Sequence, residues 1–431
     1  MYAEPIRGTR GILDRLAGVR MRSSMLIRPK GIRSVTCDGG GSRRVAGRKI
    51  QRVLVVGAPF GDGHMRAADA VGCLLRQRNP DLEVAVEDMF AHLFRPLHLN
   101  RAFRSAYRWS TSRFHGHPHR RLYQVASGWP GIVCRLSDLA LGRSAARWLR
   151  RIAPDLVIAT HPVAAYLCAQ RQAARDTPVI PLVTDSGPVN RIWFHGRYDR
   201  LLLTDPGTRE HAVRVLGPTS NVTVIGAPVL PALYTRRQQA ESRDRLGLCQ
   251  RFTVLLTAGG AGLGHGVLAA ARHLAGSDLD VQLILNAGDN KELLARFHDI
   301  AAHRPWLVRG PSDDFEVLLA ACDLVIGKAG WFTLNEAAFS GRPTLIVDVV
   351  PGQEEFNAHA AEAMGVARCV RPSEIVSWVR RYASAPNLLR TDFAVDEPAR
   401  FVAGWPLRLA RALSDLVLMA EPTTRPSSSA P

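Results

Sequence analysis

The residues best suited to chemistry lie between positions 323 and 357. An apolar run at 324–326 leads into a turn that ends at Gly330, and Thr333 is placed to cap the helix that follows. The free N–H groups and the positive dipole end of a helix start suit a diphosphate. This order of strand, glycine turn and helix N-terminus predicts half of a nucleotide-binding unit.

Charged and amide side chains surround this helix start. Lys328 adds a positive charge in the turn, and Glu336 lies one turn inside the helix, where its carboxylate can accept hydrogen bonds from ribose hydroxyls. A second apolar strand, at 344–347, leads into an acidic loop that holds Gln353 and Glu354. An amide and a carboxylate are suitable partners for the hydroxyls of a sugar.

A glycine-rich loop in the first half of the chain carries a second set of candidate groups. The apolar run 53–56 is typical of a strand buried on both faces of a parallel sheet, and it leads through Gly61, Asp62 and Gly63 to His64. An imidazole titrates near neutrality, which makes His64 a candidate general base, with Asp62 as the carboxylate of the same loop. The alternative is a structural histidine that caps the glycine turn.

Strands alternate with helical stretches along most of the remaining chain. This alternation predicts two doubly wound α/β domains, at residues 50–235 and 250–398. Functional groups in such sheets collect at the carboxyl ends of the strands, where His161, Asp185 and His195 fall. Asp185 could orient the candidate base or bind an acceptor, and each of the three could equally be a turn or capping residue.

A cluster of glycines opens the second of these domains. Gly259, Gly260 and Gly262 follow a predicted strand at 253–256. Glycines at such a turn let the backbone approach a phosphate closely. By itself the spacing also fits an ordinary turn before a helix.

The composition is that of a soluble globular protein with enough length for two cores. The chain has 431 residues, of which 46% are apolar and 22% charged. Its seven cysteines are dispersed without a CxxC pair, which favours a reducing compartment and argues against disulfides and zinc. The apolar runs are too short to span a bilayer, and residues 1–20 lack the apolar core of a secretory signal.

The positive charge is concentrated in two segments. Residues 1–50 hold twelve Arg and Lys against three acids, and residues 98–151 hold eleven Arg against one acid. Their excess accounts for the whole formal net charge of +18, so the rest of the chain is nearly neutral. Aromatic residues are interleaved with the arginines of 98–151. This pattern fits an anionic membrane surface, a single-stranded nucleic acid, or a solvated helical face over core aromatics.

Both ends of the chain have the composition of disordered tails. Residues 1–49 could be a membrane-touching tail, a targeting segment, or an over-extended start with initiation at Met21 or Met25. Helical periodicity at 399–420 predicts a C-terminal helix that could pack back across the domain boundary, and 421–431 are rich in Pro and Ser.

Taken in order, these motifs resemble the monogalactosyldiacylglycerol synthase family, which includes processive diacylglycerol glucosyltransferases. The chain looks more distantly similar to the enzyme that adds N-acetylglucosamine to lipid-linked peptidoglycan precursors. The resemblance covers about residues 51–380. It implies a GT-B fold, in which two Rossmann-like domains face a cleft, and a hexosyltransferase that uses a UDP-sugar and a lipid acceptor. The strings that carry it are the loop ending at His64, Ile158–Pro162, Val183–Asp185, Trp193–His195, Gly226–Val229, and the Lys328-Ala-Gly, Thr333, Glu336, Pro351-Gly-Gln-Glu-Glu and Asn357 series.

The resemblance also implies roles for single residues of this chain. Thr333 would bind the phosphates, Glu336 the ribose, and Gln353 and Glu354 the donor sugar. The resulting prediction assigns donor binding to Gly259, Gly260, Gly262, Lys328, Gly330, Thr333, Glu336, Gln353, Glu354 and Asn357, the acceptor side to Gly61, Gly63, His161 and His195, and catalysis to His64, Asp62 and Asp185. No cofactor or metal is predicted, because a helix start with Lys328 could stabilise a leaving diphosphate and no Asp-x-Asp pair is placed as in metal-dependent GT-A enzymes.

Two positions depart from the family pattern. Trp331 and Phe332 follow Lys-Ala-Gly where the family usually has small residues. Their rings could narrow the phosphate pocket, stack on the uracil or the sugar, or weaken donor binding. Pro59 stands where the plant-type enzymes have an Asp that is a candidate base.

We therefore expect an inverting transferase that moves a hexose or N-acetylhexosamine from a UDP-sugar to diacylglycerol or another lipid alcohol. We expect it to be cytoplasmic and peripheral on the inner face of the plasma membrane, bound through residues 98–151 and not to nucleic acid. Three alternatives stay open: a transferase with a small-molecule acceptor, a catalytically weak UDP-sugar-binding protein, and a UDP-N-acetylglucosamine 2-epimerase of the same architecture.

Overall fold

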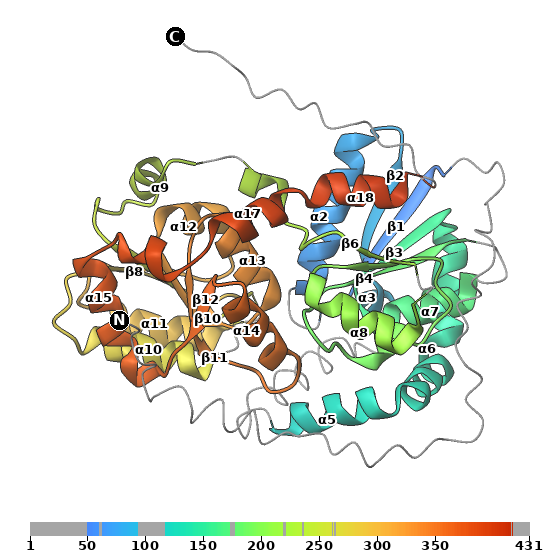
Figure 1. Ribbon diagram of the computed structural model, residues 1–431, viewed down its shortest axis with the longest axis horizontal. Helices are drawn as coiled ribbons and strands as arrows, with labels where there is room; N and C mark the ends of the chain where they lie inside the picture. The colour runs from blue at the N-terminus through green and yellow to red at the C-terminus, as the bar shows by residue number, and fades with distance from the viewer. Residues whose placement is uncertain are drawn as a thin grey trace, which may run out of the picture. The chain divides into compact units, whose positions relative to one another are not determined.

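The computed structural model describes residues 50–59, 63–93, 117–172, 177–218, 221–234, 237–260, 262, 264–414 and 416. Its framework is two parallel six-stranded sheets with helices around them (Figure 1). The predicted site residues Gly61 and Asp62 lie outside the described residues. So do the predicted tails, 1–49 and 421–431, and most of the first third of the basic segment.

The first sheet has the strand order β2-β1-β3-β4-β5-β6, and every neighbouring pair is parallel. Successive residues of β1 alternate between two apolar cores: Val53 and Val55 pack into one cluster, and Leu54 and Val56 pack into the other. A strand covered on both faces needs a continuous apolar run, which is why the sequence pattern identified it. The strands are β1 (Arg52–Gly57), β2 (Glu83–Asp88), β3 (Leu156–Ala159), β4 (Val179–Val183), β5 (Leu201–Leu203) and β6 (Val222–Val224).

In the part of the chain that the structure describes, six helices belong to this sheet. A glycine-rich connection leads from β1 into α2, and Pro162 and Pro206 begin two others, because proline is tolerated in the first helical turn. The helices are α2 (Gly63–Arg78), α3 (Met89–Leu93), α5 (His117–Gly128), α6 (Pro130–Ile152), α7 (Pro162–Gln172) and α8 (Pro206–Leu216), with 3₁₀ turns η4 (Arg191–Phe194) and η5 (Pro231–Tyr234).

The second sheet repeats the arrangement, with the order β12-β11-β10-β7-β8-β9 and parallel pairing throughout. Its strands are β7 (Thr253–Thr257), β8 (Gln282–Asn286), β9 (Leu307–Arg309), β10 (Leu324–Lys328), β11 (Thr344–Asp348) and β12 (Ala367–Cys369). Its helices are α9 (Gln239–Arg245), α10 (His265–Ala275), α11 (Lys291–Ala301), α12 (Phe315–Ala321), α13 (Trp331–Phe339), α14 (Gln353–Ala363), α15 (Ile375–Ser384) and α16 (Leu388–Asp392), with a 3₁₀ turn η6 (Pro372–Glu374). The prediction of two doubly wound halves is confirmed.

Two helices stand where the sequence predicts one C-terminal helix. They are α17 (Asp396–Ala403) and α18 (Trp405–Leu413), separated at Gly404. Pro406 has no N–H and would clash with the preceding turn of a continuous helix, so it begins a new one. Trp405 and Leu409 of α18 are buried in the apolar cluster of the first sheet. The chain therefore does cross back from the second sheet to the first (Figure 1).

The helix starts around the predicted site differ from expectation in two places. Thr333 does not cap α13: Gly330 is the N-cap and Thr333 lies in the first turn. The helix begins early because Trp331 and Phe332 are drawn into the apolar core. The predicted acidic loop at 351–355 is also partly helical, since Gln353 begins α14.

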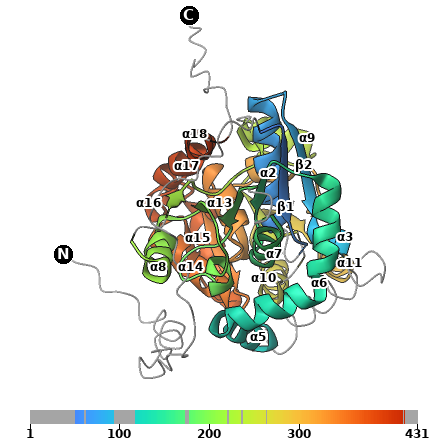
Figure 2. The same cartoon turned by 90° about the vertical axis from the view of Figure 1, so that its right-hand side faces the viewer.

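Helices α5 and α6 present a face that the other described elements leave uncovered. Figure 2 shows both in teal, joined at an angle. Buried residues of α6 pack against α3 and α7. Large apolar side chains on the outer side are more than half exposed, namely Leu122, Val125, Trp129, Ile132, Leu136 and Leu139, which we call the apolar ridge.

Candidate active site

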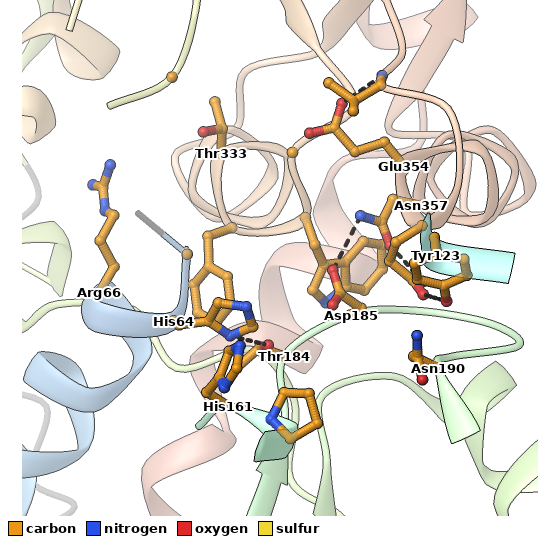
Figure 3. Close-up of a pocket in the computed structure, with 18 of the residues that line it drawn as sticks. His64, Arg66, Tyr123, His161, Thr184, Asp185, Asn190, Thr333, Glu354 and Asn357 are labelled. Atoms are coloured by element: carbon orange, nitrogen blue, oxygen red, sulfur yellow. Dashed lines mark hydrogen bonds between the residues drawn. The ribbon is translucent and has the colours of Figure 1, made fainter. Parts of the chain in front are cut away.

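A cavity of about 320 Å³ is lined by residues that follow strands of both sheets (Figure 3). A second cavity, of about 370 Å³, shares Arg66, Gly259, Gly260 and Thr333 with it. Most of the predicted site residues line the first cavity: Gly63, His64, His161, Asp185, Gly259, Gly260, Lys328, Gly330, Thr333, Gln353, Glu354 and Asn357. The described residues Gly262, Glu336 and His195 line neither cavity.

His64 lies in the first turn of α2 with one ring nitrogen held by neighbouring strand ends. Its Nδ1 is 2.6 Å from the carbonyl oxygen of Thr160 and 3.0 Å from the Thr184 hydroxyl oxygen. A carbonyl oxygen can only accept, so Nδ1 carries the hydrogen and donates it. The other ring nitrogen, Nε2, then keeps its lone pair and can accept a proton.

Burial keeps His64 and His161, two of the histidines that line the cavity, neutral. Desolvation lowers the pKa of His64 to about 4, although the Thr160 carbonyl opposes the shift. The His161 ring lies edge-on to His64, 4.9 Å between centroids, and burial and His64 lower its pKa well below the usual value. Both imidazoles are therefore uncharged near neutral pH.

His195 is brought to a different place. Its ring lies 6.0 Å from the Tyr166 ring, and a Cβ added at Gly131 would come within 3.3 Å of it. Burial and the charge of Arg135 lower its pKa. It therefore packs between α6 and α7. Its position after a predicted strand was not enough to predict whether it lines the cavity.

A buried amide joins the two sheets beside the cavity. Asn357 is 1% exposed, accepts a hydrogen bond from the N–H of Ser186 at 3.1 Å, and donates to Asp185 at 3.4 Å and to the carbonyl of Ala329 at 3.3 Å. Burial raises the pKa of Asp185 to about 6, against the effect of the Asn357 bond. Gln353 adds a bond from its Nε2 to the Ser186 carbonyl at 2.7 Å.

The opposite wall consists of the start of α13 and the glycine turn after β7. The first N–H groups of a helix have no partner within it, and Trp331, Phe332 and Thr333, which carry such groups, line the cavity. Figure 3 shows Thr333 across the cavity from His161. The arrangement matches an anion site at a helix N-terminus.

Lys328 and Glu354 form an ion pair at this wall. The second oxygen of Glu354 accepts the N–H of Val350 at 3.0 Å. The Lys328 side chain passes close to Gly259 and Gly330, where an added Cβ would lie 3.3 and 3.4 Å from it. Glycine at both positions thus leaves room for the lysine, and the positive charge stays beside the helix start.

Glu336 is buried behind the cavities and pairs with a residue of the other half. Its Oε1 lies 2.7 Å from the guanidinium of Arg66, which lines both cavities. Its Oε2 has no hydrogen-bond partner among the described residues. Burial raises the pKa of Glu336 and Arg66 opposes this shift. One carboxylate oxygen is therefore left with unused accepting capacity.

Trp331 and Phe332 bind the start of α13 to the first sheet. The indole N–H of Trp331 donates to the Thr204 hydroxyl at 3.0 Å, and both rings are at most 5% exposed. The Phe332 ring would lie 3.2 Å from a Cβ at Gly63. The two rings fill the space between helix start and first sheet, and the cavity of about 320 Å³ remains beside them.

Several cavity residues were missed in the sequence. Arg66 stands two positions after His64 on α2, and that proximity was an available signal. Tyr123 and His119 come from α5, far from any motif, and Asn190 precedes a 3₁₀ turn. Only the folded chain brings these side chains together.

The described residues lack two kinds of feature. They contain no group of three or more His, Cys, Asp or Glu residues arranged to hold a metal ion. None of their helices combines the length and the apolar character needed to cross a membrane.

The Arg66–Glu336 pair makes a testable contribution to stability. We expect Arg66→Gln to lower the free energy of unfolding by about 3 kcal/mol at neutral pH, because it leaves a buried carboxylate without its counter-charge. The native pKa of Glu336 then rises further. The folded variant then keeps a proton to higher pH than the folded unmodified chain does, so the loss should grow as pH rises above the native pKa of Glu336 in the unmodified chain.

Chemical unfolding at pH 5 and pH 8 measures this effect. Adding Glu336→Gln to the variant should restore most of the loss. The matched control is Arg296→Gln, which breaks an exposed pair with Glu292 within one helix and should cost less than about 0.5 kcal/mol. An equal loss at both pH values, or no rescue, would contradict the assigned pairing.

Comparisons with known proteins agree with the family resemblance predicted from the motifs. The model of the family described as "Monogalactosyldiacylglycerol (MGDG) synthase" matches residues 64–229. The chain is 28% identical over 351 residues to the chloroplastic monogalactosyldiacylglycerol synthase of Spinacia oleracea, covering 77% of this chain and 66% of that protein. It is 24% identical over 361 residues to the processive diacylglycerol beta-glucosyltransferase of Bacillus pumilus, covering 79% and 88%. The chain thus spans slightly less than two thirds of the spinach protein.

Solved structures share the fold at low identity. A UDP co-structure of S. aureus MnaA matches with a TM-score of 0.57 at 12% identity, covering 85% of this chain and 96% of that one. Anabaena Alr3699/HepE in complex with UDP and glucose matches with a TM-score of 0.53 at 15% identity, covering 85% of this chain and 100% of that one. Acinetobacter baumannii MurG matches with a TM-score of 0.50 at 15% identity, and the match covers 85% of this chain and 100% of that one. The fold is GT-B, and the chain is similar in sequence to the monogalactosyldiacylglycerol synthases and processive diacylglycerol glucosyltransferases, as its motifs predicted.

Proposed function

We propose that the chain is an inverting glycosyltransferase that moves a hexose or N-acetylhexosamine from a UDP-sugar to a lipid alcohol such as diacylglycerol. The observation that carries the proposal is one cavity with two chemically different walls. A neutral imidazole with a free lone pair, on His64, stands on one wall. The anion-binding start of α13 stands on the other.

The acceptor reacts at the histidine wall in this proposal. The acceptor oxygen attacks the anomeric carbon as the bond from that carbon to the diphosphate oxygen breaks, and the hydroxyl proton passes to Nε2 of His64. Attack from the face opposite the diphosphate inverts the anomeric centre. Asp185 is the second candidate for the proton, since a carboxylate with a pKa of about 6 is a stronger base than an ordinary one.

The donor occupies the other wall and the second cavity. The N–H groups at the start of α13, with Thr333 and the glycine turn, bind the diphosphate and stabilise the charge that develops on it. Lys328 adds positive charge without a metal. Glu336, which the family motif assigns to the ribose, lies behind the cavity wall and would accept a ribose hydroxyl at Oε2 once the ligand displaces that wall. Gln353 and Glu354, which line the cavity, contact the sugar.

The three alternatives predict different products. A small-molecule transferase would glycosylate soluble aglycones, a binding protein would take up UDP-sugar without turnover, and a 2-epimerase would release N-acetylmannosamine. The fold does not separate them, because a UDP-GlcNAc 2-epimerase from Neisseria meningitidis also matches with a TM-score of 0.56. A glycolipid product is therefore the result that would distinguish the proposed function from the three alternatives.

Two measurements test the proposal. A thermal-shift screen of UDP-sugars identifies the donor, since a bound ligand raises the unfolding temperature by mass action. Radiolabelled donor is then incubated with diacylglycerol in vesicles and, separately, with soluble aglycones. Label in a glycolipid supports the proposal, and label only in water-soluble products contradicts it.

Glu336 and His64 should have separable kinetic effects. Glu336→Ala removes a contact to the donor, so we expect a large increase in the donor KM with a smaller change in kcat. His64→Ala removes the base, so we expect kcat to fall by about 10² to 10⁴ with little change in KM. His298→Ala, at an exposed position on α11, is the matched control. Small and equal effects at the two site positions would contradict the assigned roles.

We propose further that the apolar ridge on α5 and α6 docks the protein on the anionic inner face of the plasma membrane. Leu139 is 81% exposed and Trp129 62%. The only acid in the two helices, Asp138, is paired with Arg171. Arginines flank the ridge, and each basic group near an anionic surface contributes about 1 kcal/mol. They are the exposed residues Arg121, Arg135, Arg143, Arg147, Arg150 and Arg151.

Docking predicts a specific loss of vesicle binding. The change Leu136→Glu with Leu139→Glu should weaken binding to phosphatidylglycerol vesicles at least tenfold in a sedimentation assay, because it removes apolar area and adds repulsion. The matched control, Ala302→Glu with His303→Glu, adds the same charge at exposed positions on the second half. Molar salt should also release the unmodified protein. Retention unaffected by either treatment contradicts the docking surface.

A further inference from the structure

Helix α5 reaches across to the turn that the proposed function assigns to the donor sugar. The Tyr123 hydroxyl donates to Oε1 of Gln353 at 2.5 Å. The Tyr123 ring lies against Gly352, where an added Cβ would come within 3.3 Å of it. Gly352 has a φ of 116°, a backbone conformation that favours glycine. Glycine at this position therefore both makes the turn and admits the ring.

The Tyr123 bond decides how the Gln353 amide is oriented. Its Oε1 accepts from Tyr123, and its Nε2 donates to the carbonyl of Ser186 at 2.7 Å. Both partners belong to the first half of the chain, whereas Gln353 belongs to the second. An amide held at both ends has one orientation, so it meets a ligand without first having to order itself.

A second contact holds the same helix to the same turn. Arg120 lies 3.4 Å from Glu355, one turn of α5 before the tyrosine contact. Burial raises the pKa of Tyr123 far above its usual value, so its hydroxyl remains a donor at every physiological pH. The inner side of α5 is thus attached to the first turn of α14 by a neutral and a charged contact.

The outer side of the same helix belongs to the apolar ridge. Leu122 and Val125, on either side of Tyr123 in the chain, are 62% and 57% exposed. A helix of twelve residues is marginal in water by itself, and its position depends on what it packs against. A lipid surface that covers Leu122 and Val125 would hold α5, and with it Tyr123, in place.

We propose that α5 couples the lipid surface to the sugar end of the donor site, with Tyr123 as the positioning residue for Gln353. The inference rests on the proposed function. In this inference, the chain binds a UDP-sugar most tightly when α5 lies on a membrane, because the lipid surface adds to the contacts that keep α5, and with it the Gln353 amide, in place. The uridine and diphosphate, which other residues bind, are unaffected.

Calorimetric titration of the full chain tests this coupling. The ligands are UDP and whichever of UDP-glucose, UDP-galactose and UDP-N-acetylglucosamine the unmodified chain binds most tightly. Each is titrated with and without phosphatidylglycerol vesicles that lack diacylglycerol. The variants are Tyr123→Phe, which removes the hydroxyl and keeps the ring, and Tyr382→Phe. The control removes a comparable hydroxyl bond, to Asp392 at 3.1 Å, away from both cavities.

The expected result is a selective loss. Tyr123→Phe should weaken UDP-sugar binding about threefold to tenfold in the presence of vesicles, the range for one hydrogen bond, and should leave UDP binding unchanged. Vesicles should tighten UDP-sugar binding by the unmodified chain and by Tyr382→Phe, but not by Tyr123→Phe. A structural role alone would change UDP and UDP-sugar binding together.

Other outcomes overturn the inference and separate it from the functional proposal. If the unmodified chain makes glycolipid and Tyr123→Phe behaves like Tyr382→Phe, the coupling is wrong and the function stands. Parallel loss of UDP and UDP-sugar binding also refutes the coupling. If the unmodified chain binds none of the three UDP-sugars, the functional proposal fails, and the coupling with it.

Discussion

The candidate site depends on the hydrogen bonds of one buried side chain, Asn357. Its amide is almost wholly removed from water, and it bonds Ser186 and Asp185 of the first half and Ala329 of the second. A buried amide that lost one of these partners would pay a desolvation penalty of about 1–3 kcal/mol. The bonds therefore favour one relation between the two sheet edges, and the cavity lies between those edges.

Charge within the cavity is balanced in pairs. Lys328 pairs with Glu354 and Arg66 with Glu336, and in each pair at least one partner is deeply buried or enclosed by glycine turns. Paired charges are tolerated at a buried site where single charges are not. A ligand that brings its own negative charge, such as a diphosphate, would change the partners of both cations. Apart from Asp185, the charges of the empty site are thus balanced, and the site holds cations that an anion could attract.

Helix α5 has one side in the cavity wall and another side on the protein surface. Helix α5 lines the cavity through Tyr123 and His119, and its other side contributes Leu122 and Val125 to the apolar ridge. A lipid substrate leaves the membrane only at a large cost in apolar exposure. An opening beside an apolar and basic surface would shorten that transfer. One helix, α5, therefore contributes both to the cavity proposed for the acceptor and to the surface proposed to dock on the membrane.

Much of the fold and part of the site could be predicted from the chain because they depend on local order. The continuous apolar run at Val53–Val56 predicts a doubly covered strand, and the glycine turn before Trp331 predicts a helix start after a strand. Those patterns repeat through both halves, and residues such as His64 and Lys328 follow them at fixed positions. Family motifs extend this reading to Asn357.

The rest was decided by tertiary structure, since it depends on contacts between residues distant in sequence. The 3–4 spacing from Leu122 to Leu139 is the usual mark of a buried helix face, yet these side chains are exposed. His195 follows a predicted strand and lies away from the cavity. Tyr123 reaches Gln353 across 230 positions. Sequence order therefore determined which segments become strands, turns and helix starts, whereas packing determined which side chains meet and which remain exposed to solvent.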